Sequence, residues 1–267
     1  MEVVLVTGVG GLLGSRFSKW LIDSKRDVRV VGIDDFSGGY EDFVDDEVTL
    51  YKRDLAVDEI QDIFQVHKPN YVYHFAALSD LNSSINKPIE TVKTNIYGTV
   101  NVLEACKINN IKRFIYASTV YVNSKEGSFY RCSKQSAEHY IEEYSNEFGL
   151  DYTILRFGSL YGPRSNSTNG LFNIVKKALT EKRVSYEGSK DAIREFIHVE
   201  DAAISSVKIL DDKYINSNLI FTGLESIKVI DLLGILAEIL DIEEEVEFIE
   251  KKHQKHYIKT PYNYKTN

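Results

Sequence analysis

Short β-rich runs alternate with segments of helical periodicity over roughly the first 160 residues, and this alternation constrains the fold more than any other feature of the sequence. Helix-length segments between successive strands are typical of right-handed βαβ units, which build a parallel sheet with helices on both faces. The predicted strands are Val3–Thr7, Val28–Ile33, Tyr71–Phe75, Arg113–Ala117 and Tyr152–Leu155. We therefore predict an α/β fold with a doubly wound parallel sheet.

Apolar residues at helical spacing predict the helices and a change of organisation along the chain. The predicted helices are 12–21, Ile89–Ile108, Arg131–Phe148, Leu171–Thr180, Ala202–Leu210 and Ile230–Leu240. After about Gly158 the alternation loosens into a turn-rich connection. We expect residues 1–158, with returns near 194–222, to form the sheet domain. Residues 159–193 and 223–267 are then a smaller, interleaved C-terminal region.

The composition excludes several classes of protein. The 267 residues carry 32 basic and 40 acidic side chains, a net charge of −8 that argues against general nucleic-acid binding. No apolar run approaches the roughly 20 residues of a membrane-spanning helix, and the N-terminus lacks a signal-peptide pattern. Cys106 and Cys132 are the two cysteines, so we expect neither a disulfide framework nor a metal site. These features predict a cytoplasmic protein without nucleic-acid or membrane partners.

A glycine-rich turn follows the first predicted strand and opens the first predicted helix. Gly8, Gly11 and Gly14 give the spacing G-x-x-G-x-x-G. Glycine suits such a turn because a pyrophosphate must approach bare backbone, and the helix N-terminus then offers N–H donors. The motif alone is weak, but its place between a strand and a helix is typical of Rossmann-type dinucleotide binding. The candidate contacts are Gly8, Gly10, Gly11, Leu12, Leu13 and Gly14.

An acidic residue, Asp34, ends the second predicted strand 20 residues after Gly14. A carboxylate there can accept hydrogen bonds from the adenosine ribose and would repel a 2′-phosphate. Asp35 follows, and no Arg or Lys occurs between Gly32 and Glu41. The sequence therefore favours NAD over NADP as the cofactor.

Tyr130 and Lys134 lie four residues apart, so a phenol and an ammonium group share one face of a predicted helix. A tyrosine is a poor base at its usual pKa of about 10, but a nearby cation lowers that pKa toward neutrality. Ser118 and Thr119 follow a predicted strand and are candidates to hydrogen-bond the reacting oxygen. The alternative is a chance pair on a surface helix, but the preceding dinucleotide loop favours a catalytic pair.

Taken in order, these residues resemble the extended short-chain dehydrogenase/reductases, in particular the NAD-dependent nucleotide-sugar epimerase/dehydratase family. The resemblance extends over nearly the whole chain. Beyond the residues above, it rests on Asp54-Leu55, His74–Ser79, Ser84–Pro88, Asn95–Asn101, Arg156–Pro163 and Arg194–Ala202.

The resemblance implies a role for each matching residue. It implies that Tyr130 is the catalytic acid and base, that Thr119 and Ser118 are the assisting hydroxyls, and that Lys134 also contacts the nicotinamide ribose. The remaining cofactor contacts that it implies are Asp54, Leu55, Ala76, Ala77, Ser79 and Asn95. For Asp54 a helix cap is the alternative interpretation.

The resemblance also implies a nucleoside-diphosphate sugar as the partner of Arg194, Ser79 and Ser159. A guanidinium fork fits phosphate oxygens bidentately, although an ion pair with Glu195 is the alternative for Arg194. Many relatives carry Asn at the position of Ser159. For the histidines His74 and His198 we expect structural hydrogen bonds rather than chemistry.

Three departures from the family pattern affect the predicted activity. Val120 and Tyr121 follow Thr119 where dehydrating relatives carry Asp-Glu, which disfavours 4,6-dehydratase activity. Tyr130 follows Thr119 by only 11 residues, a shortened loop that predicts a more open site. The chain ends at Asn267, before the C-terminal helix usual in the family, so we expect a truncated substrate-binding region.

The leading hypothesis is an NAD-dependent nucleotide-sugar 4-epimerase that acts by transient oxidation at sugar C4. One alternative is a 4-keto reductase, dehydrogenase or decarboxylase of the same family. Another is a non-catalytic NAD-binding sensor or assembly protein. The family also implies a homodimer, packed through the helices Ile89–Ile108 and Arg131–Phe148.

Overall fold

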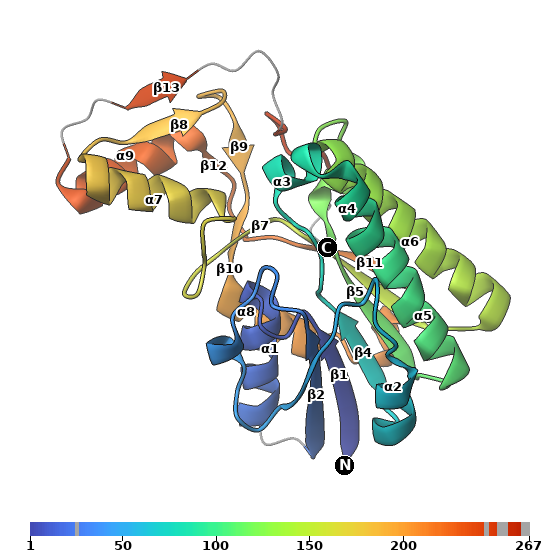
Figure 1. Ribbon diagram of the computed structural model, residues 1–267. Helices are drawn as coiled ribbons and strands as arrows, with labels where there is room; N and C mark the ends of the chain where they lie inside the picture. The colour runs from blue at the N-terminus through green and yellow to red at the C-terminus, as the bar shows by residue number, and fades with distance from the viewer. Residues whose placement is uncertain (25–26, 243–245, 250–255, 263–267) are drawn as a thin grey trace.

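The computed structural model describes residues 1–24, 27–242, 246–249 and 256–262. A seven-stranded sheet lies at its centre, in the order β11-β6-β5-β4-β1-β2-β3 (Figure 1). Its strands are β1 (Glu2–Thr7), β2 (Val28–Asp34), β3 (Thr49–Lys52), β4 (Tyr71–His74), β5 (Arg113–Thr119), β6 (Tyr152–Phe157) and β11 (Ser217–Phe221). All neighbouring pairs are parallel, which confirms the predicted α/β, Rossmann-type fold.

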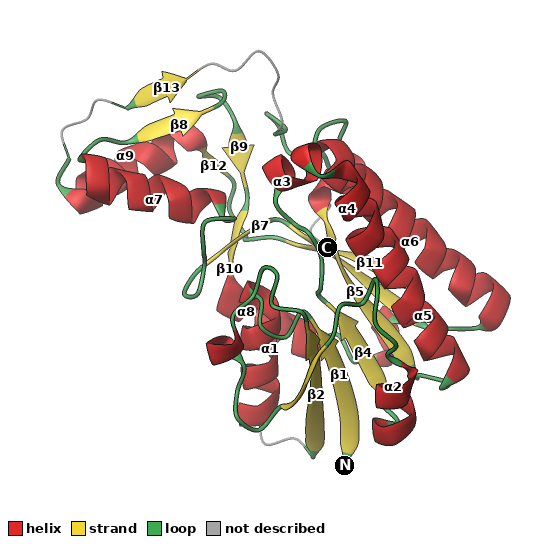
Figure 2. Cartoon of the chain, viewed as in Figure 1, coloured by secondary structure: helices red, strands yellow, loops and turns green. Residues whose placement is uncertain are grey.

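Helices cover both faces of the sheet (Figure 2). One face packs against α1 (Leu12–Asp23) and α8 (Val199–Lys208), and the other against α2 (Gln61–His67), α5 (Gly98–Ile108) and α6 (Ser128–Phe148). Side chains of β1 alternate between the two cores: Val3 and Leu5 enter one, Val4 and Val6 the other. A strand buried on both faces reads as a continuous apolar run, which is why the central strands could be predicted.

The predicted helix Ile89–Ile108 is divided into three parts. It consists of α4 (Pro88–Val92), a π-helical turn (Lys93–Tyr97) and α5, and it follows the short helix α3 (Leu81–Asn86). Single π-helical turns inside α-helices often occur at functional sites. Here the turn carries Asn95, one of the predicted site residues.

A smaller region with its own apolar core adjoins the carboxyl edge of the sheet. It contains α7 (Gly170–Glu181), α9 (Val229–Leu240) and the strand pairs β8 (Ser185–Glu187) with β13 (Glu247–Ile249) and β9 (Ile193–Arg194) with β12 (Ile227–Lys228). The chain enters it through β7 (Ser159–Tyr161), which pairs with β10 (Phe196–His198). The last part of the predicted small region, 263–267, lies outside the described residues.

Short 3₁₀ turns complete the chain at Glu41–Phe43, Val120–Asn123 and Asp212–Tyr214. Within the described ranges, no helix combines the length and apolar character needed to cross a membrane.

Candidate active site

The glycine-rich turn lies where the strand order of the sheet reverses. The chain runs from β1 to β2 on one side of β1, while β4 adjoins the other side, and open α/β sheets bind ligands at such a point. Gly8 follows β1 with a φ of +71°, and a Cβ atom there would lie 2.6 Å from the backbone nitrogen of Ala76, in the loop after β4. The two loops that border the crevice therefore touch at a position that requires glycine.

Gly14 closes the same turn against its own backbone. A Cβ atom on Gly14 would lie 2.1 Å from the carbonyl oxygen of Gly8. Gly11 is the N-cap of α1, which begins at Leu12, and glycine has no side chain with which to cap the first N–H groups. A bare backbone turn followed by uncapped helix donors fits a dinucleotide pyrophosphate.

Asp34 is buried beside this turn at the end of β2. Its Oδ2 accepts a hydrogen bond from the backbone N–H of Gly10 at 2.8 Å, and its Oδ1 accepts one from Phe36 at 2.8 Å. Burial raises the pKa of the Asp34 carboxyl group, and the two backbone hydrogen bonds oppose that shift. The carboxylate is thus fixed next to the glycine turn, where the ribose of a dinucleotide was predicted.

Asp54 and Leu55 lie in the loop after β3. Asp54 Oδ1 accepts from the Ala56 N–H at 2.8 Å in a local turn, and no helix begins there, since α2 starts at Gln61. Leu55 is buried, and its carbonyl oxygen accepts from Asn101 Nδ2 at 2.9 Å. The hydrogen bond of Leu55 ties this loop to α5.

The loop after β4 is held by a buried amide from the π-helical turn. Asn95 Oδ1 accepts from the Leu78 N–H at 2.7 Å, and Asn95 Nδ2 donates to Ser133 Oγ on α6 at 2.9 Å. Asn95 thereby supports a loop in which Ala77 is half-buried and Ser79 is exposed. These contacts give Asn95 a structural role that its sequence motif did not specify.

The two histidines of the strand ends have structural partners. His74 Nδ1 bonds Thr7 Oγ1 at 2.7 Å and its Nε2 bonds Thr99 Oγ1 at 2.9 Å. Burial lowers the pKa of His74 to about 3, so the ring is neutral. The Glu200 N–H donates to His198 Nδ1 at 3.3 Å, which caps α8.

Tyr130 lies near the start of α6 and is hydrogen-bonded to the Thr119 side chain at the end of β5. Burial raises the pKa of Tyr130 to about 12, and the bond to Thr119 opposes the shift. We expected the positive charge of Lys134 to lower the pKa of Tyr130, but in the protein this pKa is raised. Desolvation, which disfavours a phenolate, outweighs the hydrogen bond with Thr119.

Lys134 follows Tyr130 by one helical turn and is 2% exposed. Its Nζ donates to the carbonyl oxygen of Ala117 at 2.7 Å and lies 4.5 Å from the ring centre of Tyr116. Burial lowers the pKa of Lys134 to about 7, while the negative charge of Glu138 opposes the shift. A buried lysine that exchanges its proton near neutrality is suited to assist a proton transfer.

Ser118 has a different partner from the one its sequence position predicted. Its Oγ donates to Glu138 Oε1 at 2.5 Å, and Arg156 bonds the same carboxylate through Nε at 3.1 Å and Nη2 at 2.7 Å. Of the two candidate hydroxyls, Thr119 is the one beside Tyr130. Sequence reasoning missed Glu138, although its place four residues after Lys134 puts both on one helical face.

Arg194 is occupied by groups of the protein itself. Its Nη1 donates to the carbonyl oxygens of Ile193 at 2.8 Å and Tyr257 at 2.7 Å, and its Nη2 donates to the Tyr186 hydroxyl at 3.2 Å. The guanidinium also lies 4.8 Å from the ring centre of Tyr257, which is hydrogen-bonded to Ser159. The expected open phosphate fork is thus covered, because residues 256–262 pack onto it.

The same C-terminal segment meets the shortened loop after β5. Tyr121 bonds His256 Nδ1 at 2.5 Å through its hydroxyl, and its ring lies 5.1 Å from that of Tyr257 and 6.5 Å from that of Tyr130. Glu195 bonds Tyr262 in this segment. From the length of the loop we expected a more open site. Instead, the C-terminal segment covers this edge.

Comparisons with known proteins agree with this architecture. Residues 4–218 match the sequence model of the NAD dependent epimerase/dehydratase family. The UDP-glucuronate 4-epimerase of Thermodesulfobacterium geofontis is 27% identical over 81% of this chain and 75% of its own.

Two solved structures resemble most of the chain. UDP-glucose 4-epimerase of Thermotoga maritima with UDP-glucose has a TM-score of 0.86 and 26% identity, covering 94% of this chain and 87% of its own. UDP-glucuronic acid 4-epimerase of Bacillus cereus with UDP-glucuronic acid and NAD has a TM-score of 0.84 and 26% identity, covering 93% and 86%.

Proposed function

The chain belongs to the NAD-dependent epimerase/dehydratase family, and on that premise we propose that it is a nucleotide-sugar 4-epimerase. Its cofactor is NAD, which when bound would supply a hydride acceptor for a sugar carbon. The observation that carries the proposal is Tyr130, hydrogen-bonded to Thr119 at the carboxyl edge of the sheet and one helical turn before buried Lys134. The similarity to UDP-sugar 4-epimerases supports a UDP-sugar as the substrate.

The proposed cofactor contacts combine the backbone turn with one buried carboxylate. Gly8, Gly11 and Gly14 would hold the pyrophosphate, and Asp34 the adenosine ribose. Asp34 keeps lone pairs for the ribose hydroxyls because each oxygen accepts one backbone N–H. The negative charge there would repel a 2′-phosphate, which favours NAD over NADP.

The proposed chemistry requires Tyr130 to take and return one proton. Tyr130 accepts the proton of the sugar C4 hydroxyl as C4 is oxidised, and it donates that proton back when C4 is reduced on its other face. Thr119 orients the shared oxygen. Because the pKa of Tyr130 is about 12 in the protein itself, the step needs positive charge beside the phenol, which Lys134 supplies when protonated.

The residues after Thr119 favour epimerisation over dehydration. Val120 is buried and Tyr121 is bonded to His256, so neither position offers an acid for the loss of water from the sugar. Without such an acid, elimination of water from the sugar is disfavoured. The 4-keto reductase, dehydrogenase and decarboxylase reactions remain the alternatives that the assay below separates.

We further propose that the small region, 159–193 and 223–267, binds the nucleoside-diphosphate sugar. Ser159 is the proposed contact from this region, and Arg194 and Ser79 are proposed contacts from the returning segment and the sheet domain. Because Arg194 donates to Tyr257 and Tyr186, a diphosphate would have to replace the Tyr257 carbonyl oxygen. Charge-assisted bonds to phosphate are stronger than bonds to a neutral carbonyl, which favours that exchange.

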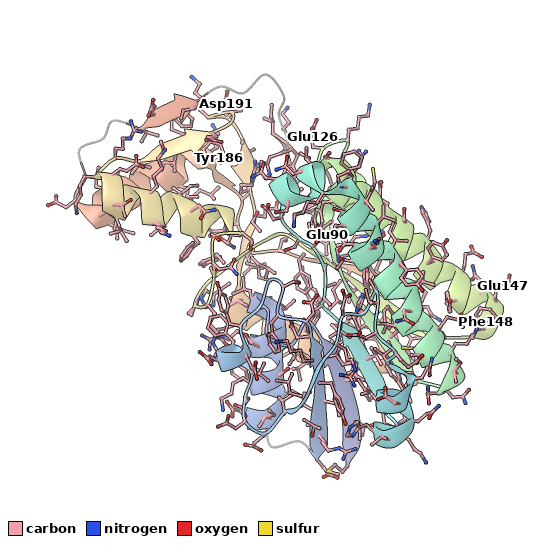
Figure 3. The ribbon with its side chains drawn as sticks, viewed as in Figure 1. Glu90, Glu126, Glu147, Phe148, Tyr186 and Asp191 are labelled. Atoms are coloured by element: carbon pink, nitrogen blue, oxygen red, sulfur yellow. The ribbon has the colours of Figure 1, made fainter. Side chains whose placement is uncertain are left out.

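A homodimer through α4, α5 and α6 is also part of the proposal. Large apolar side chains are exposed on α4 and α6, at Ile89, Val92, Tyr140 and Phe148, and Tyr97 is exposed on the π-helical turn between α4 and α5. Figure 3 shows Glu90 on α4 and Phe148 at the end of α6 farthest from the small region. A second copy of the chain is the proposed occupant, because exposed apolar surface of this kind is typical of an interface.

A screen of UDP-, GDP-, CDP- and dTDP-sugars with product NMR tests the substrate class. An epimerase yields the C4 epimer without net formation of reduced cofactor, whereas a reductase or dehydrogenase consumes added cofactor and a decarboxylase releases CO₂. A sensor would bind NAD and turn over none of the sugars. Each outcome selects one of the hypotheses.

A further inference from the structure

An ion pair between a buried carboxylate and a partly buried guanidinium involves Glu138, one helical turn after the proposed catalytic lysine. The carboxylate of Glu138 on α6 receives two bonds from the Arg156 guanidinium on β6 and one from Ser118 on β5. The side chains of Glu138 and Arg156 are 7% and 20% exposed. Burying two charges is costly and adds little stability by itself, so the pair requires an explanation beyond packing.

The pair is joined to the reaction site through one helix. Tyr130, Lys134 and Glu138 follow one another at intervals of four residues, so their side chains share one face of α6. Ala117 and Ser118 are adjacent on β5, and they accept from Lys134 and donate to Glu138 respectively. The ammonium and the carboxylate are therefore held by neighbouring residues of the same strand.

The other titratable groups near Lys134 are neutral. His74 on β4 has its pKa lowered to about 3 by burial, and burial raises the pKa values of Tyr116 on β5 and Tyr130 on α6. Of the described residues, Glu138 is the charged neighbour that stabilises the ammonium group of Lys134, and Arg156, which also senses Glu142, is the cation paired with Glu138. A negative charge stabilises the ammonium form of lysine and a positive charge destabilises it.

We propose that Glu138 and Arg156 are positioning residues that act through Lys134, Glu138 favouring its charged form and Arg156 limiting that effect. The inference rests on the proposed role of Lys134 in the epimerase reaction. It explains why a carboxylate and a guanidinium are buried together one turn beyond the lysine. It also gives Ser118 a function, because its hydrogen bond fixes the Glu138 carboxylate.

Opposite single substitutions distinguish this electrostatic role from a packing role. Glu138→Gln leaves the Arg156 charge unopposed, and Arg156→Gln leaves the Glu138 charge unopposed. The pKa of Lys134 is followed by NMR of ¹³Cε-lysine protein with NAD, with the resonance assigned by Lys134→Arg. Glu143→Gln makes the same chemical change at an exposed position of α6 and serves as the control.

We expect the pKa of Lys134 to fall by about one unit in Glu138→Gln and to rise by a similar amount in Arg156→Gln. The double variant and Glu143→Gln should stay near the wild-type value, and the alkaline limb of the activity profile should follow the same order. Equal pKa values in all folded variants, or shifts of the same sign in both single variants, would overturn the proposal. If Glu138→Gln does not fold, the test rests on Arg156→Gln alone: a rise in the pKa of Lys134 supports the proposal, and an unchanged or lowered pKa overturns it. Because the NMR titration needs no turnover, failure of the proposed function would not be mistaken for failure of this inference.

Discussion

Lys134 combines two properties that oppose each other. It is buried against Tyr116 and Ala117, which lowers the pKa of its ammonium group to about 7, yet the proposed reaction uses its positive charge beside Tyr130. A lysine with such a lowered pKa changes its charge within the physiological range of pH. Small electrostatic changes around Lys134 therefore have large effects on the fraction of molecules in which this lysine is protonated.

The buried lysine predicts a specific dependence of stability on pH. Between pH 7 and 10.5, folded Lys134 has lost its proton while an unfolded lysine retains it, so raising the pH favours folding. The free energy of unfolding of the wild type should rise over this range relative to Lys134→Met, measured by urea denaturation. Lys19→Met, which removes an exposed ion-paired lysine, should run parallel to the wild type. If the free energies of unfolding of the wild type and Lys134→Met change with pH in parallel, the lowered pKa of Lys134 is contradicted.

Gly14 predicts the effect of one added methyl group on the cofactor turn. In Gly14→Ala the Cβ atom would meet the Gly8 carbonyl oxygen at 2.1 Å, so the turn must shift, and we expect a loss of about 3 kcal/mol of stability together with weaker NAD binding. Gly38→Ala is the matched control, because its methyl group enters open space among the described residues. Calorimetric NAD binding and urea denaturation measure both effects. Equal behaviour of the two variants would show that the turn does not need glycine.

At the scale of elements, burial explains which features could be predicted from sequence. The five predicted strands lie in the centre of the sheet or next to it, where both faces are covered. The strands β3 and β11 were missed because they are edge strands with partly exposed side chains. The glycine turn and the Tyr130–Lys134 pair are local patterns and could be found.

Long-range contacts account for what the sequence could not predict. The bond from Ser118 to Glu138 and that from Arg194 to Tyr257 join residues 20 and 63 positions apart. No local pattern indicates which partner such a side chain selects. The π-helical turn was also not predicted, because its apolar spacing reads as one continuous helix.

His74 connects three elements, so its replacement should lower the free energy of unfolding. Its ring bonds Thr7 on β1 and Thr99 on α5, so His74→Leu would leave two buried hydroxyls without this partner and cost about 2–4 kcal/mol. His139→Leu, at an exposed position on α6, should cost much less. Thermal and urea denaturation compare the two variants. A small loss in His74→Leu would refute the structural role given to this histidine.

At the scale of the whole molecule, an acidic chain is proposed to bind two anionic ligands. The net charge of −8 opposes the approach of NAD and a sugar diphosphate. Local features offset that field: the N-terminus of α1, Lys134 and Arg194. These groups lie near the carboxyl edge of the sheet and the small region. Their positive electrostatic potential therefore acts where both ligands are proposed to meet.

The proposed dimer predicts that charge on one helix face separates the subunits. Ile89 on α4 and Ile239 on α9 are 73% and 72% exposed, so Ile89→Asp and Ile239→Asp make the same change on different surfaces. Light scattering after size exclusion should show a dimer for the wild type and Ile239→Asp and a monomer for Ile89→Asp. A monomeric wild type, or a dimer that survives Ile89→Asp, would reject the proposed interface.

The proposed reaction is a redox-neutral inversion at sugar C4, carried out by Tyr130. The decisive measurement incubates the purified protein with UDP-sugars without added NAD or NADH, following the C4 epimer by NMR and the absorbance of reduced nicotinamide. We predict epimer formation with no net change in absorbance, a rate lower by about 10²–10⁴ in Tyr130→Phe, and a normal rate in Tyr140→Phe, an exposed tyrosine on the same helix. Net reduction of the cofactor, or an undiminished rate in Tyr130→Phe, would contradict the account.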